Sequence, residues 1–427
     1  MSILRKAVAT SACVSVMWSG AFLAPTQAGT LICAQQTPAH EKFVWEPTDS
    51  EWQSARAIAD NMTINQLASA TLMIRYFGPN SGGSSLQSAS NLRLLGDSTP
   101  YKALEILQPS GVAYMRDNAK TARDAAREIT LNESVTAPWF ATAVDQEGGI
   151  VNRLSGDIEP PLAASRIGKI NSLFVAEKVA TLSAKQLRAA KIKTVFAPVA
   201  DVRSSVSTVS MSARMLGSDA RRVSALLKAQ LIGYGKQGVL ATVKHFPGLG
   251  GVKADTHKTV AVYSFTKTRL CEVDLEPFRT AVATGAPSIM VGHGIYPGLG
   301  TAPASGNYKI VTKLLRNEMG YEGIIITDSM TMKGAAANLP SDQNLYRRAI
   351  NAGNDVILMP GNPRQIRNLI AADLREGRIS LSERRISISR VIAWQSARSR
   401  VAATLRVYGP GDLTLLNEAR TFQAKYS

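Results

Sequence analysis

The chain has 427 residues, of which 45% are hydrophobic and 19% charged, and its formal net charge is +17. A chain of this length can bury a large core, either as one barrel or as two ordinary domains. Its basic residues are scattered and are not interleaved with aromatic residues, so nucleic acid is not expected as a partner. The charge suits association with an anionic cell envelope, and a plain solvated basic surface is the alternative interpretation.

The first residues predict export. MSILRK is basic, AVATSACVSVMWSGAFLA is apolar, and Thr26-Gln27-Ala28 is typical of a cleavage site, so residues 1–28 are expected to be a secretory signal peptide. A retained membrane anchor is the alternative, which the short and interrupted apolar run disfavours. Removal of 28 residues from the 427 leaves 399, and loss of Arg5 and Lys6 lowers the net charge from +17 to +15. We therefore expect a protein of the periplasm or the extracellular space.

Two of the three cysteines, Cys33 and Cys271, lie outside this leader. A disulfide between them would suit an oxidising compartment. Cys33 falls in a segment, residues 29–45, that we expect to be an irregular lead-in, so the sequence leaves the pairing open. Neither cysteine has the spacing of a metal site.

Short apolar runs rich in Val and Ile alternate with helical patterns through the rest of the chain. Such runs are typical of parallel strands that are covered on both faces. The eight predicted strands are TLMIRYF from Thr71, GVAYMRD from Gly111, FATAVD from Phe140, TVFAPV from Thr194, VLATVKH from Val239, SIMVGHG from Ser288, GIIITD from Gly323 and DVILMP from Asp355.

The segments between these strands predict helices. VSALLKAQLIGYG from Val223 and IVTKLLRNEMG from Ile310 place apolar residues on one stripe, and Gly320 is a plausible helix cap. Eight strand–helix alternations indicate an α/β fold, a single (β/α)8 TIM-type barrel over residues 46–408, and a doubly wound open sheet is the alternative. Residues 409–427 are expected to form a C-terminal tail, which leaves no room for a second domain.

Polar residues gather where the predicted strands end, which is where the active site of such a barrel lies. Three of the four histidines are among them. In chain order these residues are Asp145, Gln146, Glu147 and Arg153, then Asp201 and Arg214, then Lys244, His245, Asp255 and His257, then His293, and finally Thr327 and Asp328.

Two of these groups suggest acid–base chemistry. Asp328 ends the most apolar strand, where an Asp is either a helix cap or a reacting group. Asp255-Thr256-His257 has a spacing that allows the carboxylate to bond one imidazole nitrogen, which would raise the pKa of the histidine and suit it to donate and retrieve a proton. If the Asp255–His257 pair lies opposite Asp328, we interpret the pair as an acid/base and Asp328 as a nucleophile.

Two other interpretations of the same rim are weaker. His245, Asp255, His257, His293 and Asp328 could together hold zinc, but the first predicted strand lacks the close histidine pair typical of barrel metallohydrolases. The Gly248-Leu249-Gly250-Gly251 run could suggest phosphate binding, but it lacks the full glycine fingerprint, so we expect these glycines to let a mobile loop bend over the rim.

Several motifs resemble glycoside hydrolase family 3, in its subgroup of β-N-acetylglucosaminidases with an Asp–His dyad. They are DQEGG at Asp145, FAPVADV at Phe196, KHFPG at Lys244, ADTH at Ala254, DLEPF at Asp274, GHGIYP at Gly292, IITDSMTMKGA at Ile325 and NAGNDVILMP at Asn351. The resemblance runs from about Met62 to Leu405.

The resemblance implies a role for each matching residue. Asp328 matches the nucleophile, His257 the acid/base and Asp255 its dyad partner. The positions that match residues holding the sugar are Asp145, Arg153, Arg214, Lys244 and His245. These roles imply a retaining mechanism through a glycosyl ester on Asp328. No metal or other cofactor is implied.

Two positions depart from the subgroup pattern. Members usually read KHFPGHG and DQEGGR, whereas Leu249 and Ile150 stand here in place of the second His and the Arg. The larger β-glucosidase branch takes its acid from a second domain, which we do not expect in this chain.

The sequence therefore predicts a secreted exo-β-N-acetylglucosaminidase acting on peptidoglycan fragments or related amino-sugar glycans. One alternative is a β-N-acetylglucosaminide phosphorylase on the same residues, because a neutral histidine would not repel phosphate as a glutamate would. The other is a non-catalytic wall-binding barrel. The natural aglycone and the oligomeric state are not predicted.

Overall fold

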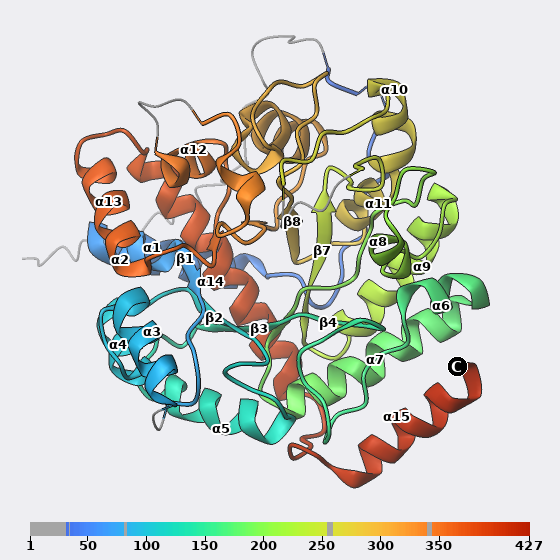
Figure 1. The fold of residues 1–427 in the computed structure, drawn as a ribbon, viewed down its shortest axis with the longest axis horizontal. Helices are drawn as coiled ribbons and strands as arrows, with labels where there is room; N and C mark the ends of the chain where they lie inside the picture. Colours follow the sequence, from blue (N-terminus) through green and yellow to red (C-terminus); the bar gives the residue numbers. More distant parts are fainter. Residues whose placement is uncertain (1–30, 34, 81–82, 254–258, 340–343) are drawn as a thin grey trace, which may run out of the picture.

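The computed structural model describes residues 31–33, 35–80, 83–253, 259–339 and 344–427. Its centre is a ring of eight parallel strands with helices around it (Figure 1). The strands are β1 (Leu72–Ile74), β2 (Gly111–Tyr114), β3 (Ala141–Val144), β6 (Thr194–Val195), β7 (Leu240–Phe246), β8 (Ser288–Val291), β9 (Ile324–Thr327) and β10 (Ile357–Leu358).

The strand order closes the sheet into a barrel. The hydrogen-bonded order is β10-β1-β2-β3-β6-β7-β8-β9, and a parallel bridge between Ile326 and Val356 joins its two ends. All eight predicted strands are present, and they lie side by side in chain order. The predicted α/β fold, a single (β/α)8 barrel, is therefore confirmed for the described part of the chain.

Helices connect the strands and cover the outside of the barrel. Those before β6 are α1 (Asp49–Asn61), α2 (Ile64–Ala70), α3 (Ser85–Leu95), α4 (Pro100–Leu107), α5 (Ala122–Glu133), α6 (Ala164–Ile170) and α7 (Leu173–Ala189). Those after β6 are α8 (Val209–Ala213), α9 (Ala220–Gly235), α10 (Lys267–Arg269), η1 (Leu270–Asp274), α11 (Glu276–Ala283), η2 (Ala304–Gly306), η3 (Lys309–Glu318), η4 (Lys333–Ala336), α12 (Leu345–Asn351), α13 (Pro363–Arg375), α14 (Leu381–Ala403) and α15 (Leu413–Tyr426).

Both predicted helical stripes lie in helices. The stripe from Val223 is in α9, which ends at Gly235, and the stripe from Ile310 is in η3, which has π-helical hydrogen bonding. Gly320 follows η3 with a φ of +69°, the left-handed conformation that suits a residue after a helix end. The segment expected as a tail contains α15, which packs on α7 (Figure 1).

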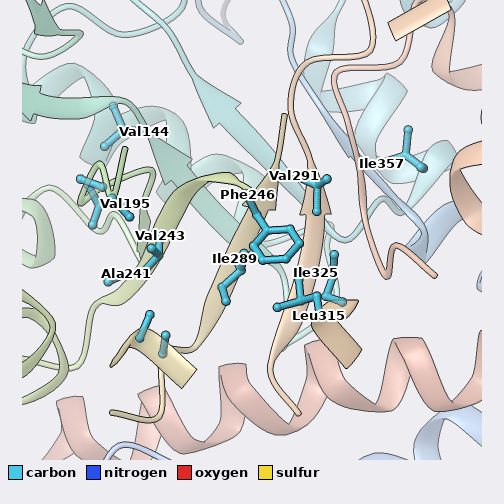
Figure 2. Close-up of a cluster of buried hydrophobic side chains, with 14 of the residues drawn as sticks. Val144, Val195, Ala241, Val243, Phe246, Ile289, Val291, Leu315, Ile325 and Ile357 are labelled. Carbon is cyan, nitrogen blue, oxygen red and sulfur yellow. The ribbon is translucent and has the colours of Figure 1, made fainter. Parts of the chain in front are cut away.

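Alternate residues of the strands build two apolar layers, because successive side chains of a strand point to opposite sides. Leu72 and Ile74 belong to the outer layer beneath the helices, whereas Met73 belongs to the layer inside the barrel. Figure 2 shows part of the outer layer, where strand residues such as Ile325 share one cluster with Leu315 of η3.

Helix α14 closes the end of the barrel at which the strands begin. Trp394 of α14 belongs to the cluster inside the barrel, and the buried Arg384 donates to the carbonyl oxygens of Asn354 and Asp355, just before β10. With this end covered, the open end is the one where the strands finish.

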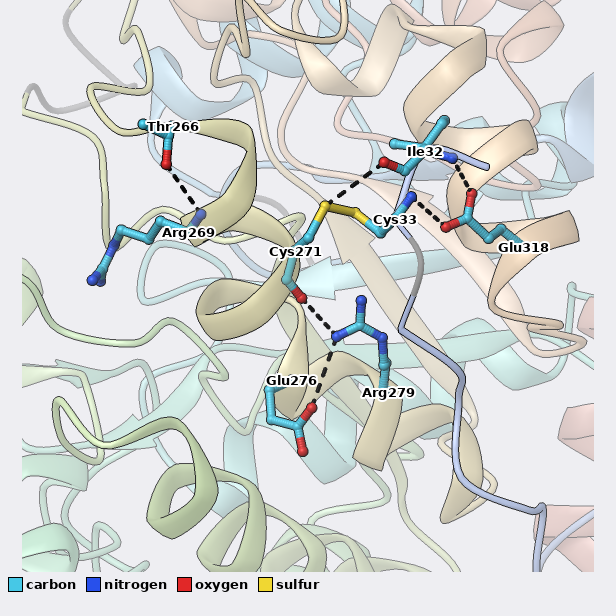
Figure 3. Close-up of a disulfide and its surroundings, with 8 residues drawn as sticks. All are labelled: Ile32, Cys33, Thr266, Arg269, Cys271, Glu276, Arg279 and Glu318. Atoms are coloured by element: carbon cyan, nitrogen blue, oxygen red, sulfur yellow. Dashed lines mark hydrogen bonds and ion pairs between the residues drawn. A yellow bond between two sulfur atoms is a disulfide. The ribbon is translucent and has the colours of Figure 1, made fainter. Parts of the chain in front are cut away.

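A disulfide joins the lead-in to the barrel (Figure 3). Cys33 pairs with Cys271 in η1, with their Cα atoms 5.5 Å apart, and both side chains are buried. The backbone N–H groups of Ile32 and Cys33 donate to the two carboxylate oxygens of Glu318 at the end of η3, at 2.7 and 2.6 Å. The pairing that the sequence left open is thus present in the structure.

None of the helices in the described part of the chain is long and apolar enough to cross a membrane. The predicted signal segment, residues 1–28, lies outside that part.

Candidate active site

A cavity of about 590 Å³ opens at the end of the barrel where the strands finish. Its floor is formed by residues of the inner apolar layer, including Phe196, Met290 and Leu358. Its polar lining consists of Arg75, Arg116, Asp117, Asp145, Glu147, Arg153, Arg214, Lys244, His245, Asp328, Ser329 and Thr331.

Two carboxylates and three cations form a chain of ion pairs in one wall of the cavity. Lys244 Nζ lies 2.7 Å from Asp145 Oδ1 and 2.6 Å from Glu147 Oε1. Arg214 Nε and Nη2 each lie 2.8 Å from an oxygen of Glu147. Arg153 Nη2 lies 3.6 Å from Asp145 Oδ2 at the outer edge, where the Arg153 side chain is 38% exposed.

These contacts keep the network charged although it is buried. Burial raises the pKa of Glu147, but Lys244 and Arg214 outweigh this effect and bring it to about 2. Burial likewise lowers the pKa of Lys244, while Asp145 and Glu147 overcome it and raise the pKa above its ordinary value. The cavity wall therefore presents fixed charges and directed hydrogen-bond donors, which can hold a polyhydroxylated ligand.

A hairpin after β3 supplies Glu147 and Arg153 to this wall. It consists of β4 (Gln146–Gly148) and β5 (Val151–Asn152). The buried Gln146 accepts from the N–H groups of Arg153 and Leu154 and so fixes the return strand. Only glycine fits at position 148, because φ is +92° and a Cβ would lie 2.4 Å from the carbonyl oxygen of Pro161.

Strand β7 directs two neighbouring residues towards the cavity. Its pairing with β8 shifts register between Lys244 and Phe246, so Lys244 and His245 both line the cavity instead of pointing to opposite sides. His245 Nδ1 lies 2.8 Å from Oδ2 of the buried Asp201, and its Nε2 lies 3.5 Å from Arg214 Nη2.

Asp328 directly follows β9 and lines the cavity. Its backbone N–H donates to the carbonyl of Val291, and its Oδ1 accepts from the N–H of Ser329 at 2.7 Å. Burial raises the pKa of Asp328, but His245, His293, the Ser329 N–H and Lys244 together lower it below its usual range. This carboxylate is ionised at neutral pH, as a nucleophile must be.

His293 has a structural role in the described contacts. Its Nδ1 lies 2.7 Å from the Ser305 hydroxyl, and its Nε2 lies 3.0 Å from the carbonyl oxygen of Ser329. Because a carbonyl only accepts, Nε2 carries the hydrogen and is not available as a metal ligand. No group of three or more His, Cys, Asp or Glu residues within the described ranges is arranged to hold a metal ion.

The structure brings six of the eight predicted site residues to this one cavity: Asp145, Arg153, Arg214, Lys244, His245 and Asp328. Asp255 and His257 lie outside the described residues. Arg214 makes two contacts with Glu147 and faces His245.

Several residues of the site have no role that the sequence predicts. Glu147 and Asp201 were recognised only as strand-end residues, although they hold Lys244, Arg214 and His245. Arg75, Arg116 and Asp117 were placed inside the first two predicted strands, whereas β1 ends at Ile74 and β2 at Tyr114, so these residues also follow strand ends.

The two departures from the subgroup pattern lie in different environments. Ile150 stands at the turn of the hairpin and is 65% exposed, whereas Leu249 is buried. The described glycines after β7 are required by close packing: a Cβ on Gly250 would lie 1.8 Å from the carbonyl oxygen of Val202, and one on Gly251 would lie 2.3 Å from the Tyr263 ring. These two glycines therefore have a packing role, and the mobility of the loop stays a prediction.

Comparison with known proteins identifies the family. Residues 105–394 match the model of the glycosyl hydrolase family 3 N-terminal domain. The chain belongs to glycosyl hydrolase family 3. The resemblance drawn from the sequence motifs is thereby confirmed, and the chain is a glycoside hydrolase by family.

Named relatives match more than half of the chain. A protein named beta-hexosaminidase from Nitrosomonas eutropha is 33% identical over 261 residues, which are 59% of this chain and 74% of the relative. One of the same name from Nitrosospira multiformis is 32% identical over 247 residues, 56% of this chain and 69% of the relative. The structure of a family 3 beta-N-acetylglucosaminidase from Paenibacillus sp. str. FPU-7 has a TM-score of 0.75 at 25% identity, covering 86% of this chain and 68% of that one.

Proposed function

We propose that the protein is an exported β-N-acetylhexosaminidase that removes terminal N-acetylglucosamine from amino-sugar glycans, and that it does so with retention of configuration. The hexosaminidase activity is supported by the names of the relatives and by family membership. The observation that carries the mechanism is the ionised Asp328 at the end of β9, in the same cavity as the network around Lys244.

In the proposed reaction Asp328 attacks the anomeric carbon of the bound sugar. Because Oδ1 accepts from the Ser329 N–H, we assign the attack to Oδ2. The C–O bond to the aglycone breaks as the glycosyl ester forms, and the departing oxygen takes a proton from the acid/base, which the family resemblance assigns to His257. Water, deprotonated by the same group, then hydrolyses the ester. Asp145, Lys244, Arg214 and His245 would hold the sugar hydroxyls, and Arg153 would close the outer edge.

We further propose that the aglycone is acidic, as in peptidoglycan fragments that carry a carboxylate. Three arginines, Arg75, Arg116 and Arg153, are among the residues that line the cavity. Asp117 pairs with Arg75 at 2.9 Å, whereas Arg116 is exposed and makes one long contact, 3.4 Å, to the carbonyl of Asn152. Its cationic head is thus available for a negatively charged group.

Export is proposed from two features. The basic and then apolar start of the chain suits a signal peptide, and the Cys33–Cys271 disulfide suits an oxidising compartment. N-terminal sequencing of the protein recovered from the periplasm or medium tests this, with a start near Gly29 expected. Recovery only in the cytoplasm with the leader intact would contradict it.

The activity is tested by release of 4-nitrophenol from its β-N-acetylglucosaminide, with and without inorganic phosphate. We expect turnover that does not depend on phosphate, release of the β-anomer by NMR, and loss of turnover in Asp328→Ala. Turnover that requires phosphate would support the phosphorylase instead. No turnover with any β-N-acetylhexosaminide would leave a non-catalytic barrel.

The covalent intermediate is tested with a fluorinated N-acetylglucosaminyl fluoride, whose fluorine slows hydrolysis of the ester. Intact-mass measurement should show one added glycosyl group, and peptide mapping should place it on the peptide containing Asp328. Labelling of another carboxylate would overturn the assignment of the nucleophile.

A further inference from the structure

Asp201 is fully buried behind the cavity, and it binds two separate parts of the site. Its Oδ2 lies 2.8 Å from His245 Nδ1. Its Oδ1 accepts from two backbone N–H groups, those of His245 at 3.2 Å and Leu249 at 2.7 Å. One carboxylate thus contacts both the imidazole that lines the cavity and the segment that leaves β7.

The hydrogen bonds around Asp201 determine the tautomer of His245. Backbone N–H groups can only donate, so Oδ1 is an acceptor, and Oδ2 requires a hydrogen on His245 Nδ1. On the other side of the ring, Nε2 faces Arg214 Nη2 at 3.5 Å, and a guanidinium group has no acceptor. In its neutral form the ring therefore carries its hydrogen on Nδ1 and directs Nε2, without a hydrogen, towards the cavity, where it can accept from a sugar hydroxyl.

Further contacts hold the segment after β7, which we define as residues 248–252. The Tyr296 hydroxyl donates to the carbonyl of Gly248 at 2.6 Å. The hydroxyls of Ser204 and Ser207 both donate to the carbonyl of Gly250, at 2.5 and 2.9 Å. These serines follow Asp201 in the same loop, so the loop after β6 holds this segment at two points.

The contact at position 249 does not depend on the side chain. The backbone N–H of Leu249 binds Asp201, while the Leu249 side chain packs beside Gly292, where an added Cβ would lie 3.6 Å from Leu249 Cδ2. The departure from the subgroup pattern at this position therefore leaves the link to Asp201 in place.

We propose that Asp201 is a positioning residue that sets the His245 tautomer for sugar binding and fixes segment 248–252 at the base of the loop that follows β7. The proposal rests on the proposed function for its kinetic consequence, but its geometric part stands on the contacts alone. Asp201 acts through His245 and the backbone and need not touch the substrate.

The substitution Asp201→Asn tests the tautomer directly. The two backbone N–H groups require an oxygen at the Oδ1 position, so the new amide would turn its NH₂ group towards His245 Nδ1. That nitrogen would then become an acceptor, and the hydrogen would move to Nε2, facing Arg214. Long-range ¹H–¹⁵N spectra of the imidazoles report the tautomer, and the chain has only four histidines, so His245→Gln identifies the signal.

We expect wild-type His245 with its hydrogen on Nδ1 and the variant with its hydrogen on Nε2, together with a loss of about 100-fold or more in kcat/KM for the 4-nitrophenyl substrate. The loss should include a rise in KM, because sugar binding is affected. Asp201→Ala should in addition speed hydrogen exchange of the peptide covering segment 248–252.

Asp274→Asn is the matched control. Asp274 is also buried and lies beside Gly248, but it bonds to the Tyr263 hydroxyl and not to His245. It should leave the His245 tautomer unchanged. A wild-type His245 with its hydrogen on Nε2, or an Asp201→Asn variant with an unchanged tautomer, would overturn the proposal. Absence of wild-type turnover would instead count against the proposed function, because the spectra test Asp201 without activity.

Discussion

Glu147 and Arg214 form a two-fold ion pair, with Arg214 Nε and Nη2 each 2.8 Å from a carboxylate oxygen. The same carboxylate lies 2.6 Å from Lys244 Nζ. Glu147 therefore connects Lys244 and Arg214, and it balances charges that would otherwise face each other across a buried space. Its position explains how Lys244, only 2% exposed, remains charged.

Replacing Glu147 with Gln should destabilise the protein by about 3 kcal/mol, because it leaves a buried cation without its partner. It should also raise KM, since Arg214 and Lys244 would no longer be held in one position. Thermal unfolding and steady-state kinetics measure the two effects. Glu418→Gln is the control: its pair with Lys178 is partly exposed, so a change of at most about 1 kcal/mol is expected.

The cost of this substitution should depend on pH. The pKa of Glu147 is about 2 in the folded protein and 4.5 in the reference state, so the unfolded chain binds more protons between these values. The stability that Glu147 contributes is complete above pH 4.5 and is lost as pH falls towards 2. The difference in unfolding free energy between wild type and Glu147→Gln should therefore shrink below pH 4.5, and a difference that grows on acidification would contradict this account.

The proposed nucleophile, Asp328, should stay ionised in mild acid. Burial opposes ionisation of Asp328, but the surrounding groups lower its pKa below 3.8. A glycosyl fluoride has a good leaving group, so the rate of covalent labelling reports the ionisation of Asp328 with little contribution from the acid/base. We expect this rate to be level from pH 7 to pH 4 and to fall below that. A midpoint above pH 5 would show that Asp328 is not held in its ionised form.

Arg116 should distinguish acidic from neutral aglycones. Arg116→Gln is expected to lower kcat/KM about 2- to 5-fold for substrates whose leaving group carries a carboxylate, in line with one exposed charge–charge contact. The loss should diminish at high salt and be absent for 4-nitrophenyl or chitobiose substrates. Arg93→Gln, on α3 and away from the cavity, should change neither class. Equal losses for both classes of substrate would mean that Arg116 does not recognise the negative charge of the aglycone.

Ionisation of Asp274 should make the protein less stable as pH rises, which is the opposite of the effect of Glu147. Burial raises its pKa to about 6, against the opposing hydrogen bond from the Tyr263 hydroxyl, whereas the reference value is 3.8. The folded state binds the extra proton, so stability falls as pH rises from 3.8 to 6 by about 3 kcal/mol at most. Asp274→Asn should remove this slope in denaturant titrations, and an unchanged slope would assign it to another group.

The barrel could be predicted from the sequence because each strand is short, apolar and covered on both faces. A run such as GIIIT predicts a buried strand without any long-range contact. The ends of the strands are predicted less accurately. The predicted strand TLMIRYF includes Arg75, whereas β1 ends at Ile74 and Arg75 lines the cavity. The helix α15 was not predicted, because its fit depends on the surface of α7, which the local sequence does not describe.

The site could be predicted only where one residue type in a motif implies chemistry. Asp328, Lys244 and His245 stand out in this way at the ends of strands. Glu147 did not, because its importance comes from contacts with Lys244 and with Arg214, 67 residues further along the chain. Asp201 likewise binds a histidine 44 residues away, and such pairings follow from the closure of the barrel.

The Cys33–Cys271 disulfide joins two residues that are 238 positions apart in the sequence. The segment between them contains the barrel strands β1, β2, β3, β6 and β7, while β8, β9 and β10 lie outside it. A single proteolytic nick anywhere between these cysteines would leave two fragments joined covalently, and they would migrate as one species until a reducing agent separated them. A nick after Cys271 would divide the ring of strands into pieces held only by hydrogen bonds and packing. The proposed nucleophile, Asp328 just after β9, lies outside the segment that this disulfide encloses.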